Sequence, residues 1–138
     1  MMADAKEIPD EARVVRDALR SLGYANAYDA PVAPWLCTEP IVVSMGDWER
    51  ECRLDDGSER GRRALLAHIC CDDRTDARVA AREVARDLWG HDWAHAAAPP
   101  RMRVVACDVG RPREYGRDRS GRWVWKVRMT MTVVVRDV

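Results

Sequence analysis

The sequence lacks the features that mark membrane-spanning, exported or strongly nucleic-acid-binding proteins. No apolar run in its 138 residues approaches the roughly 20 residues of a membrane-crossing helix. Residues 1–10 have neither the basic nor the apolar segment of a secretory signal, so we expect a protein kept in the cytosol, with no membrane partner. Its 23 basic residues are balanced by 23 acidic ones, so no overall field favours nucleic acid.

Cysteine pairs of the metal-binding or redox type are also missing. The five cysteines are odd in number and contain no CxxC spacing: Cys37, Cys52, Cys70, Cys71 and Cys107. A reducing compartment leaves such a set as thiols, and we interpret them as small buried apolar groups. The length fits a single domain, residues 1–138, with residues 1–9 as a flexible arm.

The spacing of apolar residues predicts two helices. The first covers residues 10–22, with Asp10 as its cap and Gly23 at its end. The second follows residue 73, with Asp73 or Thr75 as its cap and Gly90 at its end.

Strand patterns occupy most of the remaining chain. We expect a short strand at residues 41–43, a hairpin whose arms are residues 48–54 and 62–71, and a strand at residues 101–109. The second hairpin arm would also suit a helix, whereas residues 24–35 and 110–122 read as connections. This order predicts an α+β fold: a mostly antiparallel sheet of four to five strands, two helices packed on one face, and a long C-terminal hairpin.

The last strand, residues 123–136, is unusually long. Alternate side chains from Trp123 to Val135 form an apolar face that we expect to be buried. Fully extended, it would span about 45 Å, more than the roughly 37 Å diameter of a compact domain of this size. An unpaired edge of this length invites association, so we hypothesise that this strand, or the loop before it, works between copies of the protein.

The end of the chain resembles a known family. In "RPREYGRDRSGRWVWKVRMTMTVV", a proline and a Gly-Arg-Asp precede a turn at Ser120 and Gly121 and then an alternating aromatic strand. This is similar to the C-terminal hairpin of siphophage tail terminators, also called minor capsid or tail-completion proteins. The likeness covers most of the chain and is most specific over residues 112–131. The charged segment "GDWERECRLDDGSERGRR" and the pair Cys70 and Cys71 depart from it.

The resemblance implies a structural virion protein, assembled in the host cytoplasm, with no catalysis and no cofactor. It implies a hexameric ring at the head-proximal end of the tail tube, which ends tube growth and joins the tail to the head connector. The implied partners are further copies of the chain, the major tail tube protein and a head-completion or connector protein. DNA would be met only as it passes through the lumen.

A ring of identical copies needs two complementary surfaces on each copy. We predict that a mixed-charge loop supplies one of them, through Arg111, Arg113, Tyr115, Arg117, Asp118, Arg119 and Arg122. Acidic residues of the hairpin turn supply the other, through Asp55, Asp56 and Glu59. The alternative for the loop is an ordinary solvated turn.

Two segments imitate catalytic motifs. "HDWAH" places His91 and His95 four residues apart, as in a zinc protease, but Gly90 and two nearby prolines argue against a helix there. "HICC" offers His68 beside two thiols, which a strand would direct to opposite faces. We therefore predict no catalytic residue and no metal site.

Three other functions remain open on the residues alone. A head-completion or connector protein, such as a stopper or adaptor, is the nearest alternative. An arginine-rich nucleic-acid-binding module is another, because the loop of residues 110–122 carries five arginines close to aromatic residues. A zinc or thiol hydrolase comes last.

Overall fold

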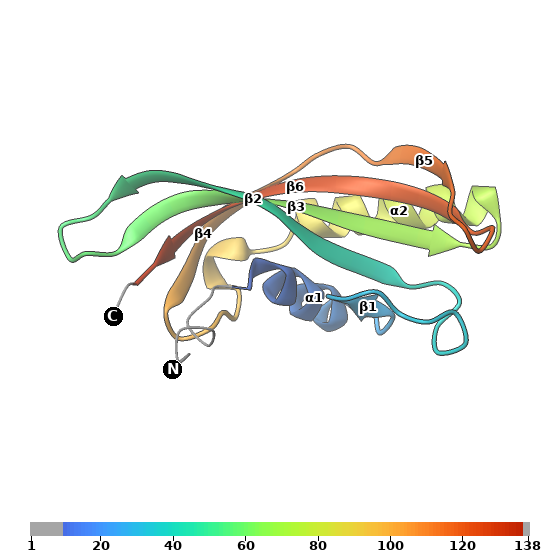
Figure 1. The fold of residues 1–138 in the computed structure, drawn as a ribbon, viewed down its shortest axis with the longest axis horizontal. Coiled ribbons are helices and arrows are strands. Elements are labelled where there is room, and N and C mark those ends of the chain that lie inside the picture. Colours follow the sequence, from blue (N-terminus) through green and yellow to red (C-terminus); the bar gives the residue numbers. More distant parts are fainter. Residues whose placement is uncertain (1–9, 137–138) are drawn as a thin grey trace.

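The computed structural model describes residues 10–136 as a long, twisted sheet with two helices against one face (Figure 1). The predicted arm, residues 1–9, lies outside the described residues. In chain order the elements are α1 (Glu11–Ser21), β1 (Ala27–Tyr28), β2 (Ile41–Arg53), β3 (Glu59–Cys71), α2 (Arg74–Trp89), the short 3-10 helix η2 (Trp93–His95), β4 (Met102–Val109), β5 (Arg113–Arg117) and β6 (Trp123–Val135).

The sheet confirms the predicted α+β class. Its strand order is β1-β2-β3-β6-β4, and β5 pairs with β6 beyond the end of β4. Every pairing is antiparallel except the two-residue parallel pairing of β1 with β2. The sheet has six strands instead of four or five, because β1 and β5 lie in segments that we expected to be connections. The strands β5 and β6 form the expected C-terminal hairpin.

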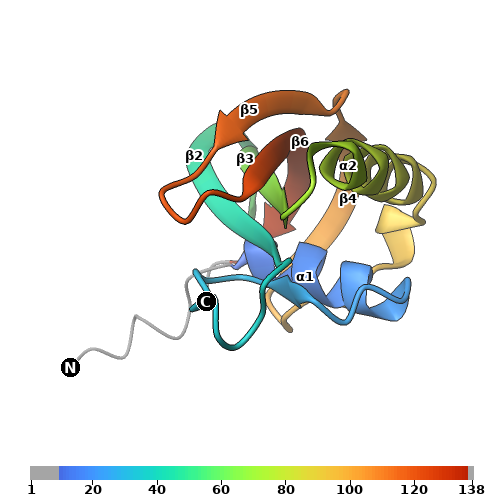
Figure 2. The same cartoon turned by 90° about the vertical axis from the view of Figure 1, so that its right-hand side faces the viewer.

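Both helices begin where the sequence predicts. The Asp10 carboxylate accepts a hydrogen bond from the Arg13 backbone N–H at 3.0 Å, and the Asp73 carboxylate accepts one from the Asp76 N–H at 3.0 Å. Each of these caps satisfies a backbone donor that has no partner inside the helix. Both helices bury an apolar stripe against the same face of the sheet (Figure 2).

Strand β2 corrects one prediction. The expected strands at residues 41–43 and 48–54 are a single strand, and two bulges interrupt its pairing with β3, between Met45 and Trp48 and between Arg50 and Cys52. A bulge adds a residue to one strand, which shifts the alternation of its side chains. The alternation of apolar and polar residues is therefore interrupted at the bulges, although the strand itself is continuous. The alternative of a helix at residues 62–71 is wrong.

The predicted core face of β6 is fully buried in its middle part only. Val127, Met129, Met131 and Val133 are all buried beneath the helices. Trp123, Trp125 and Val135 on the same face are only half-buried, and Val124 is buried although it points to the opposite face.

The edges of β6 correct our hypothesis about association. Strand β3 pairs with β6 along its whole length, from Trp123 to Val135. The other edge of β6 pairs with β5 near Trp123 and with β4 from Met129 to Val135. The strand is therefore an interior strand of an elongated sheet, and it has no long unpaired edge that a neighbouring copy must satisfy. Any association of copies would need a different surface.

The β2–β3 hairpin extends past the helices to a highly charged tip (Figure 1). Ion pairs connect its two strands at 3.0 Å between Glu49 and Arg62, at 3.2 Å between Glu51 and Arg60, and at 3.1 Å between Arg50 and Glu59. Residues 49–56 are all exposed to solvent. The unusual charge of this segment follows from that exposure.

We expect Gly61→Ala to lower the free energy of unfolding by about 1–3 kcal/mol, the usual cost of overpacking. Gly61 is buried in β3, where an added Cβ would lie 2.5 Å from the Trp48 ring and 2.7 Å from the Glu49 carbonyl oxygen. Gly46→Ala is the matched control, since its Cβ would come no closer than 3.3 Å to Ala64. Urea unfolding measures both variants, and equal midpoints would contradict the packing described here.

Candidate functional site

Most of the ten predicted interface residues lie in the turns at the two ends of the sheet, whereas Arg111 and Arg113 lie along β6, nearer its middle. Glu59 pairs with Val135, whereas Cys71, at the other end of β3, pairs with Trp123. These positions are about 40 Å apart at 3.3 Å per residue. The β2–β3 turn and the β5–β6 turn consequently occupy opposite ends of the molecule (Figure 1). The structure does not bring the acidic and basic groups together within one copy.

Asp118 organises the β5–β6 turn. Its carboxylate accepts hydrogen bonds from the Ser120 hydroxyl at 2.7 Å, the Arg122 N–H at 3.0 Å and the Arg122 Nε at 3.1 Å. Partial burial opposes ionisation, but these bonds hold the pKa of Asp118 below its ordinary value of 3.8. Gly121 completes the turn with a φ of 86°, a conformation that favours glycine. Asp118 and Arg122 are therefore held within their own chain, whereas Arg119 is exposed.

The acids at the opposite end also have partners in their own chain. Asp56 accepts hydrogen bonds from the backbone and the hydroxyl of Ser58, which lower its pKa. Glu59 contacts Arg50 at 3.1 Å and Arg53 at 3.5 Å, and the hydrogen bond from Arg50 lowers the pKa of Glu59. Both carboxylates thus stay ionised at neutral pH.

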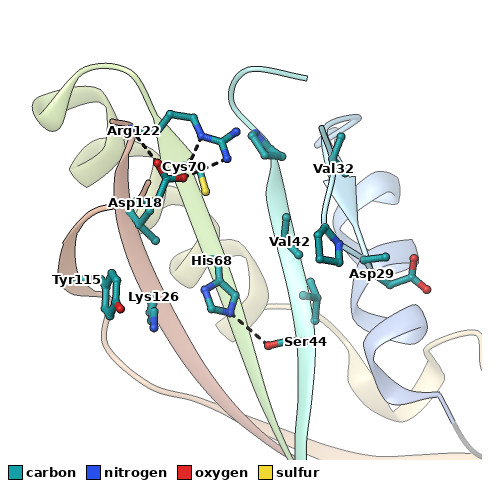
Figure 3. A pocket seen from close by; sticks show the side chains of 15 residues that line it. Asp29, Val32, Val42, Ser44, His68, Cys70, Tyr115, Asp118, Arg122 and Lys126 are labelled. Atoms are coloured by element: carbon teal, nitrogen blue, oxygen red, sulfur yellow. Dashed lines mark hydrogen bonds and ion pairs between the residues drawn. The ribbon is translucent and has the colours of Figure 1, made fainter. Parts of the chain in front are cut away.

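A shallow groove lies on the helix-free face, the face of β2, β3 and β6 that points away from the helices. Figure 3 shows this groove between the β5–β6 turn on one side and residues 29–32 on the other. Its volume is about 420 Å³. The floor carries Val42, Val124, His68 and Cys70, and Tyr115 and Lys126 stand at its rim.

The groove does not have the chemistry of a thiol enzyme. Burial raises the pKa of the Cys70 thiol, and it raises the pKa of Cys71 to about 12. A nucleophilic cysteine needs the opposite shift, because the thiolate is the reactive form. The adjacent thiols point to opposite faces of β3, as the sequence predicted. His68 contacts the Ser44 hydroxyl at 3.2 Å through Nε2.

We expect His68 to titrate below 6.5 in an NMR titration. Burial lowers the pKa of His68, and the positive charge of Lys126 lowers it further. As the pH falls, His68 therefore binds a proton in the unfolded chain at a higher pH than in the folded chain. The free energy of unfolding consequently decreases as the pH falls below about 6.5. Lys126→Met should raise the pKa of His68 but leave it below 6.5. A pKa of His68 above 6.5 in the native protein would contradict this environment.

The "HDWAH" segment folds as a packed connection. Trp93 is buried, and its Nε1 donates to the Leu88 carbonyl oxygen at 2.9 Å. The His95 Nδ1 lies 2.7 Å from the Asp92 carboxylate. The His91 ring lies edge-on to the Trp93 ring, with the ring centres 4.6 Å apart. Within residues 10–136, no three His, Cys, Asp or Glu side chains are grouped to hold a metal ion. In the same range, none of the helices has the length and apolar character to span a membrane.

From the sequence we missed an exposed apolar pair, Trp35 and Leu36. The side chains of these residues are 85% and 73% exposed in the loop that precedes β2. The available signal was two large apolar residues in a proline-rich connection, where no helix or strand periodicity offers a core to bury them. Arg122 donates to the Thr38 carbonyl oxygen at 3.4 Å, which ties this loop to the β5–β6 turn. Exposed apolar pairs of this size are typical of interaction sites.

Comparison with known proteins supplies a match in structure. No protein-family model matches the chain, and no curated protein sequence does. A chain in a solved structure of the virion of a native gene transfer agent particle has the same fold, with a TM-score of 0.62 and 18% sequence identity. The match covers 97% of this chain and 99% of that one, so it includes both ends of the sheet and both helices.

Proposed function

We propose that the protein is a structural component of a phage-like virion and that it acts there as the tail terminator. In this role a ring of copies, six by the family resemblance, caps the head-proximal end of the tail tube and joins it to the head connector. The observation that carries the proposal is the end-to-end structural likeness to a chain of a gene transfer agent virion. The resemblance of residues 112–131 to tail terminators supports the narrower role.

The two ends of the sheet suit a head-to-tail contact. In a ring, each copy uses one patch to meet a different patch on its neighbour. One end carries the exposed pair Trp35 and Leu36 beside the β5–β6 turn, where Arg119 is exposed. We assign this apolar pair, rimmed by the charged turn, to one side of the contact.

The opposite end offers a surface of matching character. A groove of about 310 Å³ there is lined in part by Leu54, Pro100 and Val134, and its charged lining residues are Asp56, Arg101, Arg103 and Arg136. Asp55 lies in the same turn and is exposed. An apolar centre with a charged rim is the usual anatomy of a specific interface. In the proposed ring, Trp35 of one copy enters this groove on the next copy.

Electron microscopy of the protein mixed with tail tubes, and separately with head connectors, tests the role. A terminator decorates one end of each tube with a ring, whether or not the free protein is monomeric. Decoration of connectors without any binding to tube ends would instead identify a head-completion protein. Absence of binding to either structure would remove the virion role.

A further inference from the structure

A basic groove on the helix-free face has no part in the proposed contact between copies. It is a hollow of about 450 Å³ between β5 and β6, next to the end of β4. Four cationic side chains line it: Arg111, Arg113, Lys126 and Arg128. Although the whole chain has no net charge, this surface is strongly positive.

The one acidic residue that lines the groove, Glu114, is already neutralised. Arg74 of α2 holds its carboxylate with two parallel hydrogen bonds, of 2.6 Å from Nε and 2.8 Å from Nη2. The bond to Arg74 lowers the pKa of Glu114, so the pair stays fully charged at neutral pH. A bidentate arginine–carboxylate pair of this kind is strong and geometrically specific. Glu114 therefore leaves the charge of the four cations uncompensated.

The cations of the groove are available to a ligand. Within residues 10–136, none of the four forms an ion pair, and the three arginines are exposed. Lys126 is held in place over the Tyr115 ring, with Nζ 3.7 Å from the ring centre. An ammonium group over an aromatic face keeps its charge and can still donate hydrogen bonds.

The sheet spaces these charges regularly. Lys126 and Arg128 lie on the same side of β6, about 7 Å apart along the strand. Arg113 is the cross-strand partner of Lys126, about 5 Å away on β5. Such a row fits a ligand whose negative charges also repeat along a line.

We propose that the basic groove binds the phosphate backbone of double-stranded DNA without reading its sequence. Phosphate contacts give affinity and position, whereas sequence is read by elements that enter a DNA groove. The helix-free face is an open strand surface with no helix projecting from it (Figure 2), which suits contacts to the phosphate backbone. The proposal stands independently of the ring, since the groove is complete within one copy.

Fluorescence anisotropy with the full chain and a labelled duplex of about 30 base pairs tests this proposal across roughly 50–200 mM salt. Four phosphate contacts predict a slope of log affinity against log salt of about −3.6 for the native protein. The double variant Arg113→Gln/Arg128→Gln should flatten the slope by about 2 and weaken binding roughly tenfold or more at the lowest salt. Its matched control, Arg13→Gln/Arg82→Gln, removes the same charge from exposed helix positions and should bind as the native protein does.

Three outcomes would overturn the proposal. The first is no binding of the duplex by the native protein at the lowest salt. The second is an equal loss of affinity in the control variant, which would indicate a diffuse charge effect. The third is binding of polyglutamate, but not of DNA, that depends on Arg113 and Arg128, which would identify an acidic protein as the ligand. None of these outcomes bears on whether the protein caps tail tubes.

Discussion

Replacing Trp35 with alanine is expected to abolish ring formation at tube ends while leaving the fold of each copy intact. The Trp35 side chain is 85% exposed, so it contributes little to the stability of the isolated chain. Buried in an interface, a tryptophan of this kind is a typical hot spot, whose truncation costs about 2–4 kcal/mol. That cost corresponds to roughly 30-fold to 1,000-fold weaker binding at each contact, and a closed ring repeats the contact at every interface.

The measurement is the fraction of tail tubes that carry a ring, alongside the unfolding midpoint of each variant. Trp89→Ala is a matched control, because Trp89 is also 75% exposed but lies at the end of α2. We expect Trp89→Ala to cap tubes normally. Normal capping by Trp35→Ala, or an equal defect in both variants, would contradict the assignment of Trp35 to the interface.

Replacing Arg63 with methionine is expected to lower the free energy of unfolding by about 3–5 kcal/mol, the usual cost of leaving a buried charge without its partner. Glu11, at the start of α1, is fully buried, and its carboxylate lies 3.3 Å from the Arg63 Nε. Arg63 also donates to the Gly46 carbonyl oxygen at 3.0 Å and lies over the Trp48 ring. This one side chain thus connects α1 to the β2–β3 hairpin.

A double variant distinguishes the effect of losing the ion pair from the effect of losing the packing contacts of Arg63. Adding Glu11→Gln to Arg63→Met removes the unpaired charge, so the double variant should be more stable than Arg63→Met alone. Arg62→Met is the exposed control, because its pairs with Glu49 and Glu51 are screened by solvent and contribute little. Chemical denaturation measures all of these variants. A double variant no more stable than Arg63→Met would show that the charge of Glu11 is not the cause.

The two helices were predictable because their signals are local. Asp10 and Asp73 each precede an apolar stripe, and the structure uses both carboxylates as caps. The glycines after the stripes likewise fall where the predicted helices should end. No distant contact is needed to place these boundaries.

The strands were harder to predict, because pairing depends on distant residues. Strand β5 is five residues long, with a bulge beside Gly116, and it becomes a strand only by pairing with β6. The alternation of β6 revealed its core face but not its position inside the sheet. That position removes the unpaired edge on which the association hypothesis rests, and we propose the exposed Trp35 loop as the contact surface instead.

The candidate site was predictable in composition but not in arrangement. The charged residues of both turns could be named from the sequence, yet the bonds that hold Asp118 and Glu59 in their own chain depend on the fold. A net charge of zero also concealed a basic groove, since the compensating acids lie on other surfaces. Only the pairing of β5 with β6 places Arg113 beside Lys126.

The length of tail tubes grown with increasing amounts of the protein tests the proposed role most directly. If the protein is a tail terminator, saturating amounts stop elongation, and each arrested tube ends in a ring of its copies. Tubes that continue to grow at saturating protein would contradict the role.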